Sequence, residues 1–563
     1  MIGLRKKTGC LLFLTLLLVP ASRAQHEIAP AVSALQNFAV GGTVIQASSG
    51  EPVVAALVLI SPVNRSDQVQ SVFTDTSGRF LFQGIAAGKY RLRATRKGYP
   101  AQDFEEHSPF FTAIAVGPDK DTGNLIFRLK PEGSIAGRVT DDEGDPVRGA
   151  KVMLFTSSTN TGERIIRSLA QTVADDQGTY SFAHLSTGTY FLAVLATPWY
   201  ARHSPQSGGA RANPGDQASN ALLDVAYPVT YYQQATEPEG ADPIALSYGD
   251  RFTADISLRA VPAVHLRLRS DADVSFGSDA PTLTQTLLGG VEVPIDSQTA
   301  AVGPNQQDLF EMAPGRYDLH YDTTIDTGEE PTYQPDAGPR HQVIDTGSKS
   351  EVNAAQGAVL ATIAGSVKFE GGGVPREAHL WLRKISSAQE FETPVSSGEI
   401  EPIEISTGRY ELKLESSEGF VLQNILSTRS RASGQILEID SSGQVQLTLT
   451  AAKGNGRLDG VVMCNNKPVA GAMVVLVPQQ DPENSMQLFR REQSSTDGTF
   501  TISAILPGRY TALAIENGWD LEWANLAALK PYLLYGQNVQ IDQNAKADIS
   551  LMCSSKSQYN HNP

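Results

Sequence analysis

The second repeat of the chain reads SIAGRV at residues 134–139, PVRGA at 146–150, DQGTYSF at 176–182 and GTYFL at 188–192. Its apolar residues tend to alternate with polar ones, which is the pattern of a strand with one buried face. Glycine, proline and aspartate stand between the apolar segments, and these residues favour tight turns. Short strands joined by such turns predict a β-sandwich.

The same order of motifs recurs along the chain. Gly-x-Tyr followed by alternating apolar residues recurs five times, at intervals of 93 to 127 residues, with its tyrosines at Tyr90, Tyr190, Tyr317, Tyr410 and Tyr510. Gly-x-Val precedes four of them and begins at Gly42, Gly137, Gly365 and Gly460. Because 563 residues are too many for one hydrophobic core, we predict a mainly β protein of about five tandem Ig/transthyretin-like sandwiches.

The repeats suggest a division of the chain into seven parts. We expect a signal peptide at 1–24, sandwiches at 38–130, 131–261, 262–356, 357–452 and 453–553, and a polar tail at 554–563. The second sandwich carries an aromatic loop insertion, and the third, which lacks Gly-x-Val, is degenerate. Short helical segments are expected only in loop insertions, at 218–226 and 521–534.

A family resemblance follows from these motifs. Pro-Val-x-Gly-Ala stands at 146–150 and 468–472, between Gly-x-Val and Asp-x-Gly-x-Tyr/Phe, with Gly-x-Tyr after them. This order resembles the carboxypeptidase regulatory-like domain, a transthyretin-like and Cna B-like sandwich, closely in repeats one, two and five and less so in repeats three and four. The chain looks like the exported bacterial proteins that carry such domains in tandem. Because related domains include starch-binding-like folds, the resemblance implies carbohydrate binding.

The ends and the charge of the chain suggest where it acts. Arg5, Lys6 and Lys7 precede an apolar run and a small-residue cleavage site before Gln25, which predicts export to the periplasm, the cell surface or the medium. No later run is long enough for a transmembrane helix, so no transmembrane segment is expected. The formal net charge of −16 disfavours nucleic acid as a partner.

Motifs of known catalytic sites are missing from the sequence. None of the nine histidines begins His-x-x-Glu, and neither His-Glu-x-x-His nor Gly-x-Ser-x-Gly occurs. The carboxylates at 141–145 fit a polar turn better than a calcium loop. We therefore predict no catalytic residue, no metal and no cofactor.

Two cysteines remain after the predicted signal peptide. Cys464 and Cys553 lie in the expected first and last strands of the fifth sandwich. An oxidising compartment favours a disulfide between them, with two free thiols as the alternative.

Aromatic residues in two loop regions are the candidate ligand-binding residues. They are Trp199, Tyr200, Tyr227, Tyr231 and Tyr232 after the second repeat, and Trp519, Trp523 and Tyr532 in the fifth. Such rings stack on sugars or anchor protein interfaces. The alternative is that they pack their own long loops onto the sandwiches.

The sequence therefore favours an exported, non-catalytic binding protein whose sandwiches form a rod. Its expected partner is an envelope glycan or another exported protein. A structural spacer of the cell envelope without a ligand is the first alternative, and an enzyme with an unrecognised site is the second.

Overall fold

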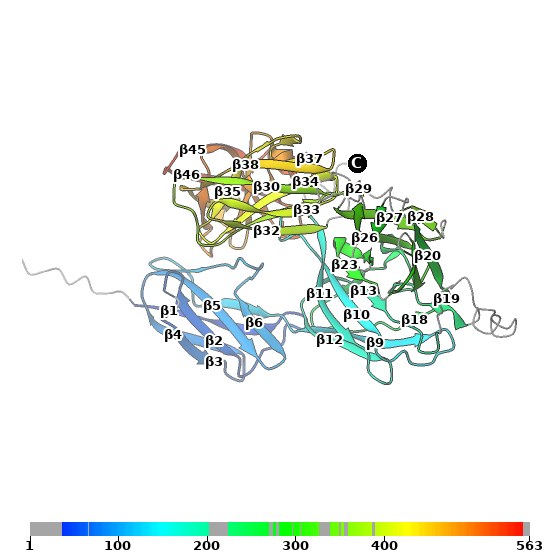
Figure 1. Ribbon diagram of the computed structural model, residues 1–563. Coiled ribbons are helices and arrows are strands. Elements are labelled where there is room, and N and C mark those ends of the chain that lie inside the picture. The colour runs from blue at the N-terminus through cyan, green and yellow to red at the C-terminus, as the bar shows by residue number, and fades with distance from the viewer. Residues whose placement is uncertain are drawn as a thin grey trace, which may run out of the picture.

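The computed structural model describes residues 37–65, 67–201, 223–269, 274–276, 281–295, 297–303, 306–325, 338–347, 351–353, 358–385 and 389–555. The predicted signal peptide, residues 218–222 of the expected first helical segment and residues 556–563 of the polar tail lie outside these ranges. Strands are the predominant element among the described residues, which confirms the mainly β fold (Figure 1).

The strands form five groups with one pairing order. In each group the first strand pairs antiparallel with a strand from the middle of the group and parallel with a strand near its end. Most of the remaining strands form the opposite side of the sandwich, and apolar side chains fill the space between the two sides. We call the groups sandwiches 1 to 5. Their division into independently folding domains stays a prediction.

Sandwich 1 spans residues 38–129. Its first sheet, in the order β4-β1-β8, contains β1 (Phe38–Gln46), β4 (Arg79–Ile85) and β8 (Leu125–Leu129). The second sheet contains β2 (Leu57–Pro62), β3 (Gln70–Phe73), β5 (Gly88–Arg96), β6 (Tyr99–Asp103) and β7 (Ile114–Val116).

Sandwich 2 spans residues 133–262. Its first sheet contains β9 (Gly133–Asp141), β12 (Thr179–Leu185), β17 (Arg251–Thr253) and β18 (Ile256–Leu258). The second contains β10 (Lys151–Ser158), β11 (Ile165–Val173), β13 (Gly188–Leu195), β15 (Thr230–Tyr231) and β16 (Ile244–Leu246). The loop insertion adds the pair β14 (Val225–Ala226) and β19 (Val261–Pro262) and the 3-10 turn η1 (Pro238–Gly240).

Sandwich 3 spans residues 264–359. Its first sheet contains β20 (Val264–Arg269), β24 (Gln298–Gly303), β25 (Gln306–Met312) and β28 (Glu351–Asn353). The second contains β21 (Val274–Phe276), β22 (Thr282–Thr286), β23 (Glu292–Pro294), β26 (Arg316–Ile325), β27 (Gly338–Asp345) and β29 (Ala358–Val359), with the turn η2 (Leu288–Gly290) between β22 and β23.

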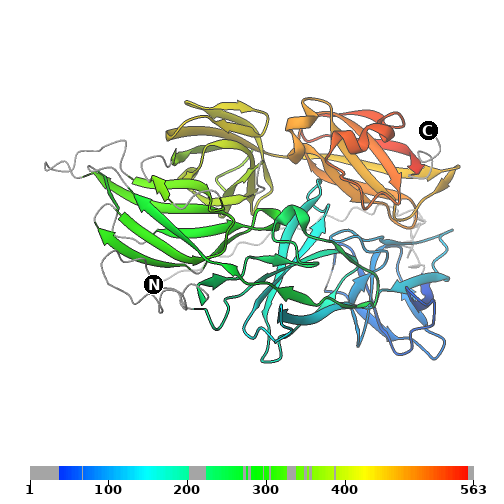
Figure 2. The ribbon, with the colours of Figure 1, turned by 90° about the vertical axis from the view of Figure 1, so that its right-hand side faces the viewer.

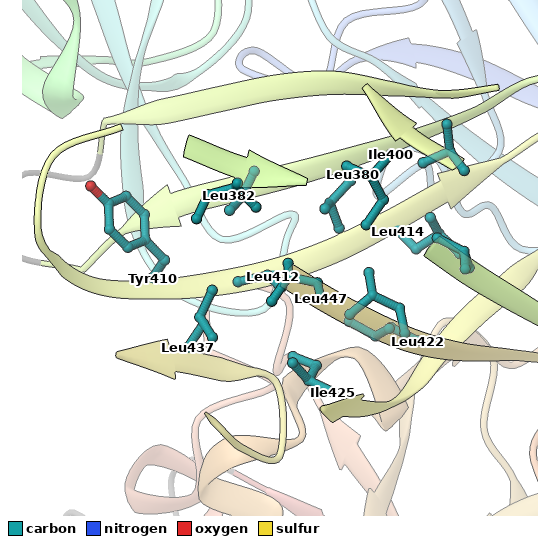
Figure 3. Packing of buried hydrophobic residues seen from close by; sticks show 14 of the residues in the cluster. Leu380, Leu382, Ile400, Tyr410, Leu412, Leu414, Leu422, Ile425, Leu437 and Leu447 are labelled. Atoms are coloured by element: carbon teal, nitrogen blue, oxygen red, sulfur yellow. The ribbon is translucent and has the colours of Figure 1, made fainter. Parts of the chain in front are cut away.

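Sandwich 4 spans residues 361–453. One side contains β30 (Ala361–Glu370), β33 (Glu399–Ile405), β35 (Phe420–Ser427) and β38 (Gly443–Lys453). The other contains β31 (Ala378–Lys384), β32 (Glu390–Ser396), β34 (Gly408–Ser416), β36 (Arg431–Ser433) and β37 (Ile436–Ile439). Pairing of β32 with β33 joins the two sides, and Figure 3 shows the leucines and isoleucines packed between them beside Tyr410.

Sandwich 5 spans residues 456–555. One side contains β39 (Gly456–Cys464), β40 (Lys467–Pro468), β43 (Thr499–Ile505) and β46 (Lys546–Ser555). The other contains β41 (Met473–Pro478), β42 (Arg490–Gln493), β44 (Gly508–Glu516) and β45 (Gln537–Ile541). The turns η4 (Pro482–Asn484) and η5 (Met486–Leu488) precede β42, and the helix α2 (Leu526–Leu533) lies in the loop after β44.

The helix α2 falls within the segment 521–534 that was expected to be helical. Asn525 caps its first turn, because its side-chain oxygen accepts hydrogen bonds from the backbone N–H groups of Ala527 and Ala528. No helix among the described residues is long and apolar enough to span a membrane.

The glycines of Gly-x-Val are needed where the first strand meets its parallel partner. A Cβ at Gly365 would lie 2.0 Å from the carbonyl oxygen of Leu447 in β38. A Cβ at Gly137 would lie 1.9 Å from that of Ala254. Any larger residue would therefore push the paired strands apart.

The tyrosines of Gly-x-Tyr close the turn before their own strand. Each hydroxyl donates to the carbonyl oxygen four residues earlier, at 2.6 to 3.0 Å; the pairs are Tyr90–Ala86, Tyr190–Ser186, Tyr317–Ala313, Tyr410–Ser406 and Tyr510–Leu506. The contact is the same even in sandwich 3, where the other motifs have degenerated.

The five sandwiches are folded back on one another, and the expected rod is wrong. Sandwiches 1, 2 and 3 follow one another in one tier, while sandwiches 4 and 5 return above them (Figures 1 and 2). Sandwich 5 thereby contacts sandwich 1: the backbone N–H of Thr496 donates to the carbonyl of Ala113, and its hydroxyl accepts from Ala115. Apolar and aromatic surfaces between the sandwiches, hidden from water only in the folded-back arrangement, account for the difference.

Candidate ligand-binding site

The predicted aromatic residues lie in different surroundings. Tyr227, Tyr231 and Tyr532 are buried, and Tyr231 is only 1% exposed. Tyr231 packs with Leu287 and Leu288 in an apolar cluster between sandwiches 2 and 3. These three rings are thus positioned to support the fold, with little surface left to offer a ligand.

The remaining aromatics of the first loop lie nearer the surface. Trp199 is 84% exposed and contacts Tyr200 edge to face, with ring centroids 5.8 Å apart. Tyr232 is half-buried and packs against Phe252. The two loops therefore do not assemble one common aromatic surface.

Trp519 lies where sandwich 5 meets sandwich 1. Its ring stacks on His107 with centroids 4.4 Å apart, and Phe110 packs beside it. Arg491, only 7% exposed, places its guanidinium 5.2 Å from the Trp519 ring centroid and 4.8 Å from that of Trp523. We call this contact between residues 104–115 and 490–523 the clasp.

Hydrogen bonds hold the polar atoms of the clasp. Gln493 donates through Nε2 to the carbonyl of Glu105 and to the hydroxyl of Thr112, both at 2.7 Å. The Nδ1–H of His107 donates to Oε1 of Gln493 at 3.2 Å. Burial lowers the pKa of His107 to about 4, and it lowers the pKa of Arg491 to about 10.

A cavity of about 970 Å³ lies beside the clasp, at the junction of four sandwiches. Sandwich 2 contributes Asn160, Thr161, Glu163, Ile165, Ile166 and Arg167, and sandwich 3 contributes Gly289, Gly290, Val291 and Glu292. Sandwich 4 contributes Trp381, Arg383, Gln389, Glu390, Phe391, Glu411, Lys413, Leu414, Glu415 and Val421. Sandwich 5 contributes Met486, Gln487, Phe489, Arg490 and Trp523.

Strand alternation in sandwich 4 builds the widest wall. Leu380 and Leu382 of β31 point into the sandwich core, so Trp381 and Arg383 point outward. Pairing of β31 with β34 then sets Trp381 opposite Lys413, and Arg383 opposite Glu411. The indole Nε1 of Trp381 is buried and has no acceptor among the described residues.

Arg383 links this wall to sandwich 2. Its Nη2 lies 2.6 Å from Oε2 of Glu411 and 3.0 Å from Oε2 of Glu163. Burial raises the pKa of Glu411, although the Arg383 charge acts in the opposite direction. The ion pairs keep charged side chains in the cavity while holding two sandwiches together.

The tip of the hairpin between β10 and β11 docks on sandwich 5. The indole N–H of Trp523 donates to the carbonyl of Thr159 at 2.9 Å, and the N–H of Ala524 donates to that of Gly162 at 3.0 Å. A Cβ on Gly162 would lie 2.3 Å from that of Ala524. This close approach seals one side of the cavity.

The loop between β22 and β23 supplies the wall from sandwich 3. Gly289 has a φ of 69°, and a Cβ there would lie 2.0 Å from the carbonyl oxygen of Ile166. Beyond it Glu292 accepts a hydrogen bond of 2.6 Å from Nε2 of Gln389, which joins sandwiches 3 and 4. Burial, with the Asp318 charge, raises the pKa of Glu292.

The wall from sandwich 5 carries one charged residue, Arg490. Its Nη1 donates to the backbone carbonyls of Gln487 at 2.5 Å and Phe489 at 2.8 Å. Burial lowers the pKa of this guanidinium. No carboxylate among the described residues forms a salt bridge with it.

Of the residues predicted as binding aromatics, only Trp523 lines this cavity. Four other lining residues were not predicted from the sequence: Trp381, Arg383, Glu411 and Arg490. Each lies in an ordinary strand pattern and becomes part of a site only where four sandwiches meet. The outward-facing tryptophan in the segment HLWLRK at 379–384 was the one available signal.

Outside the cavity, the described residues contain one group of three metal-ligand side chains, Cys464, Glu516 and Cys553. The two cysteines form a disulfide between β39 and β46, so neither offers a thiolate. We therefore assign no metal to this group.

Comparisons with known proteins agree with the repeated motifs. Residues 39–130 and 134–219 match the carboxypeptidase regulatory-like domain in tandem, which confirms the resemblance in repeats one and two. The BOS complex subunit NOMO3 of Homo sapiens is 30% identical over 174 residues, covering 27% of this chain and 13% of that protein. The chain thus matches a small part of the curated relatives. A Streptococcal ancillary pilin (11% identity, 56% of this chain, 98% of that chain, TM-score 0.20) and the minor pilin GBS52 of Streptococcus agalactiae (13%, 40%, 96%, 0.19) are distant structural neighbours.

Proposed function

We propose that this chain, which carries two consecutive carboxypeptidase regulatory-like domains, is an exported, non-catalytic protein that binds carbohydrate in the junction cavity. The observation that supports this most is the lining of the cavity, which combines the rings of Trp381, Phe391 and Trp523 with carboxylates and guanidinium groups. Sugars present apolar ring faces and many hydroxyls, so they need both kinds of contact.

The size and the polarity of the cavity fit a short stretch of glycan. At about 970 Å³ it lies at the upper end of the volumes of small-molecule sites. Arg383 and Glu411 are fixed by their ion pair and so hold their remaining donor and acceptor positions in place for hydroxyl groups. A preorganised polar wall of this kind lowers the entropy lost on binding.

Tryptophan truncation tests the proposal. The full mature chain and its Trp381→Ala variant would be titrated with a panel of soluble oligosaccharides by calorimetry, after circular dichroism has shown that both are folded. Trp199→Ala is the matched control, since it removes an exposed ring away from the cavity. We expect binding in the parent and the control, and at least a tenfold weaker binding in Trp381→Ala. Binding that is equal in all three proteins would place the site elsewhere and refute the proposal.

A second candidate function is that of a subunit in a protein assembly. The curated relatives are named as subunits of the BOS complex, which favours a protein partner. Trp199 and Leu534, at 84% and 86% exposed, are the large apolar side chains best placed to meet one. Retention of a specific protein partner that is lost in Trp199→Ala, with no glycan binding, would support this candidate instead.

A further inference from the structure

We infer that the cavity selects carboxylate-bearing sugars, and that Arg490 is the residue that recognises the carboxylate. This inference rests on the proposed function, because it names the class of glycan that the same cavity would take. It is carried by the uneven distribution of charge around the cavity and by Arg490, a partly buried cation that has no ion pair among the described residues.

The acidic residues of the lining all come from sandwiches 2, 3 and 4. Two of them are engaged by Arg383, and Glu415 pairs with Lys413. The wall from sandwich 5, in contrast, contains Arg490 and no acidic residue. A ligand therefore meets a positive wall beside Trp523 and Phe489. Across the cavity it meets walls that carry five glutamates and three basic residues, and so are acidic on balance.

Arg490 lacks a countercharge among the described residues. Its two hydrogen bonds, from Nη1, go to neutral backbone carbonyls, and burial lowers its pKa. Arg490 is partly buried, and a cation withdrawn from water without a partner is costly, so a carboxylate from a ligand would lower that cost. A guanidinium can donate two parallel hydrogen bonds to one carboxylate, and Nε and Nη2 of Arg490 are the nitrogens suited to this contact.

The opposite wall fits the other groups of such a sugar. Glu411 and Glu292 have raised pKa values because of burial, and their oxygens face a site where neutral hydroxyls can donate to them. Repulsion between these acids and the ligand's carboxylate would orient the carboxylate toward Arg490. The arrangement thus places the carboxylate of a uronic acid at Arg490 and its hydroxyls against the acidic wall.

Oligogalacturonates provide a matched test, because methyl esterification removes their charge while leaving the sugar chain intact. The full mature chain would be titrated by calorimetry with a hexamer in its acid form and in its fully esterified form. We expect the acid form to bind at least tenfold more tightly. In Arg490→Gln that preference should vanish, whereas Arg490→Lys should keep part of it.

Arg509→Gln, which alters an exposed arginine of the same sandwich, is the control and should behave like the parent. Equal affinity for both forms in the parent, or an unchanged preference in a folded Arg490→Gln, would overturn the inference and leave the proposed function standing. Binding of neutral glucans only would do the same. Absence of binding to every glycan tested would overturn both.

Discussion

At the scale of single residues, the hydroxyl of one tyrosine per repeat fixes how the strand after it begins. The hydroxyl of Tyr410 donates to the carbonyl of Ser406 at 2.6 Å, and the Tyr410 side chain is completely buried. Tyr90 makes the same bond at 3.0 Å in a more exposed place. The same hydrogen bond therefore contributes more to stability at Tyr410 than at Tyr90, because water can replace it only near the surface.

Replacing Tyr410 by phenylalanine tests this difference. The variant leaves a carbonyl without its tyrosine donor, so we expect the free energy of local opening around β34 to fall by about 1 to 2 kcal/mol. Hydrogen exchange followed by mass spectrometry on residues 408–416 measures it. Tyr90→Phe is the comparison and should lower the free energy of local opening by less than about 0.5 kcal/mol. An equal loss in both variants would show that burial does not determine how much the hydrogen bond contributes.

At the scale of the strand, Gly-x-Val marks where the first strand must approach its parallel partner. The parallel pairing of β30 and β38 runs from Ala361 to Glu370 without interruption. Gly365 lies within it at a φ of 149°, and any Cβ there would meet the backbone of Leu447. The motif therefore encodes a packing distance between two strands far apart in sequence.

Gly365→Ala should be strongly destabilising. The strands must separate to admit the methyl group, so we expect a loss of roughly 3 kcal/mol or more, visible as an early transition in scanning calorimetry. Gly373→Ala is the control, because its Cβ would meet nothing within 4 Å. A melting profile of Gly365→Ala that overlays the control would contradict this account.

The strands and turns could be predicted because their signals are local. Apolar alternation and turn residues placed the strands around Val139 and Tyr190, and the glycine of each motif marked the turns between them. The candidate site could not be predicted in the same way. Trp381 and Arg490 lie 109 residues apart on unrelated strands, and only contacts between sandwiches bring them to one cavity. Those contacts depend on how the surfaces of the sandwiches fit together, and the apolar periodicity of the sequence does not predict that fit.

At the scale of the whole molecule, the clasp between sandwiches 1 and 5 closes the chain on itself. Its centre is aromatic and cationic: Arg491 lies among the rings of Phe110, Trp519 and Trp523, with the neutral ring of His107 stacked on Trp519. Adding a proton to His107 would place a second positive charge beside Arg491. The clasp is therefore a contact that should respond to a change of pH.

Acid should open the clasp. The pKa of His107 is lowered from 6.5 to about 4 by burial, with the Lys130 and Arg491 charges acting in the same direction and the hydrogen bond to Gln493 opposing them. The closed form thus binds fewer protons than the open one, so the stability of the clasp is complete above pH 6.5 and falls by up to about 3 kcal/mol as the pH drops to 4. Hydrogen exchange in residues 490–496, corrected for intrinsic rates, should increase between pH 7 and pH 4.5.

His107→Gln separates this titration from general acid effects. The variant has no proton to gain at this position, so protection in residues 490–496 should vary much less with pH than in the parent. If parent and variant lost protection in parallel, another group would be responsible.

The closed arrangement also bears on how the molecule forms during synthesis. Lys89 of sandwich 1 bonds Ser495 of sandwich 5 across 406 residues, and joining such distant points of a flexible chain carries a large entropic cost. That cost falls once the intervening sandwiches have folded, because compact bodies span the distance with few loose segments. Assembly of the clasp is thus a last step. A chain that ends before residue 490 would leave the aromatic edge of its first sandwich exposed to solvent, and proteases and chaperones that recognise exposed apolar surface would bind there.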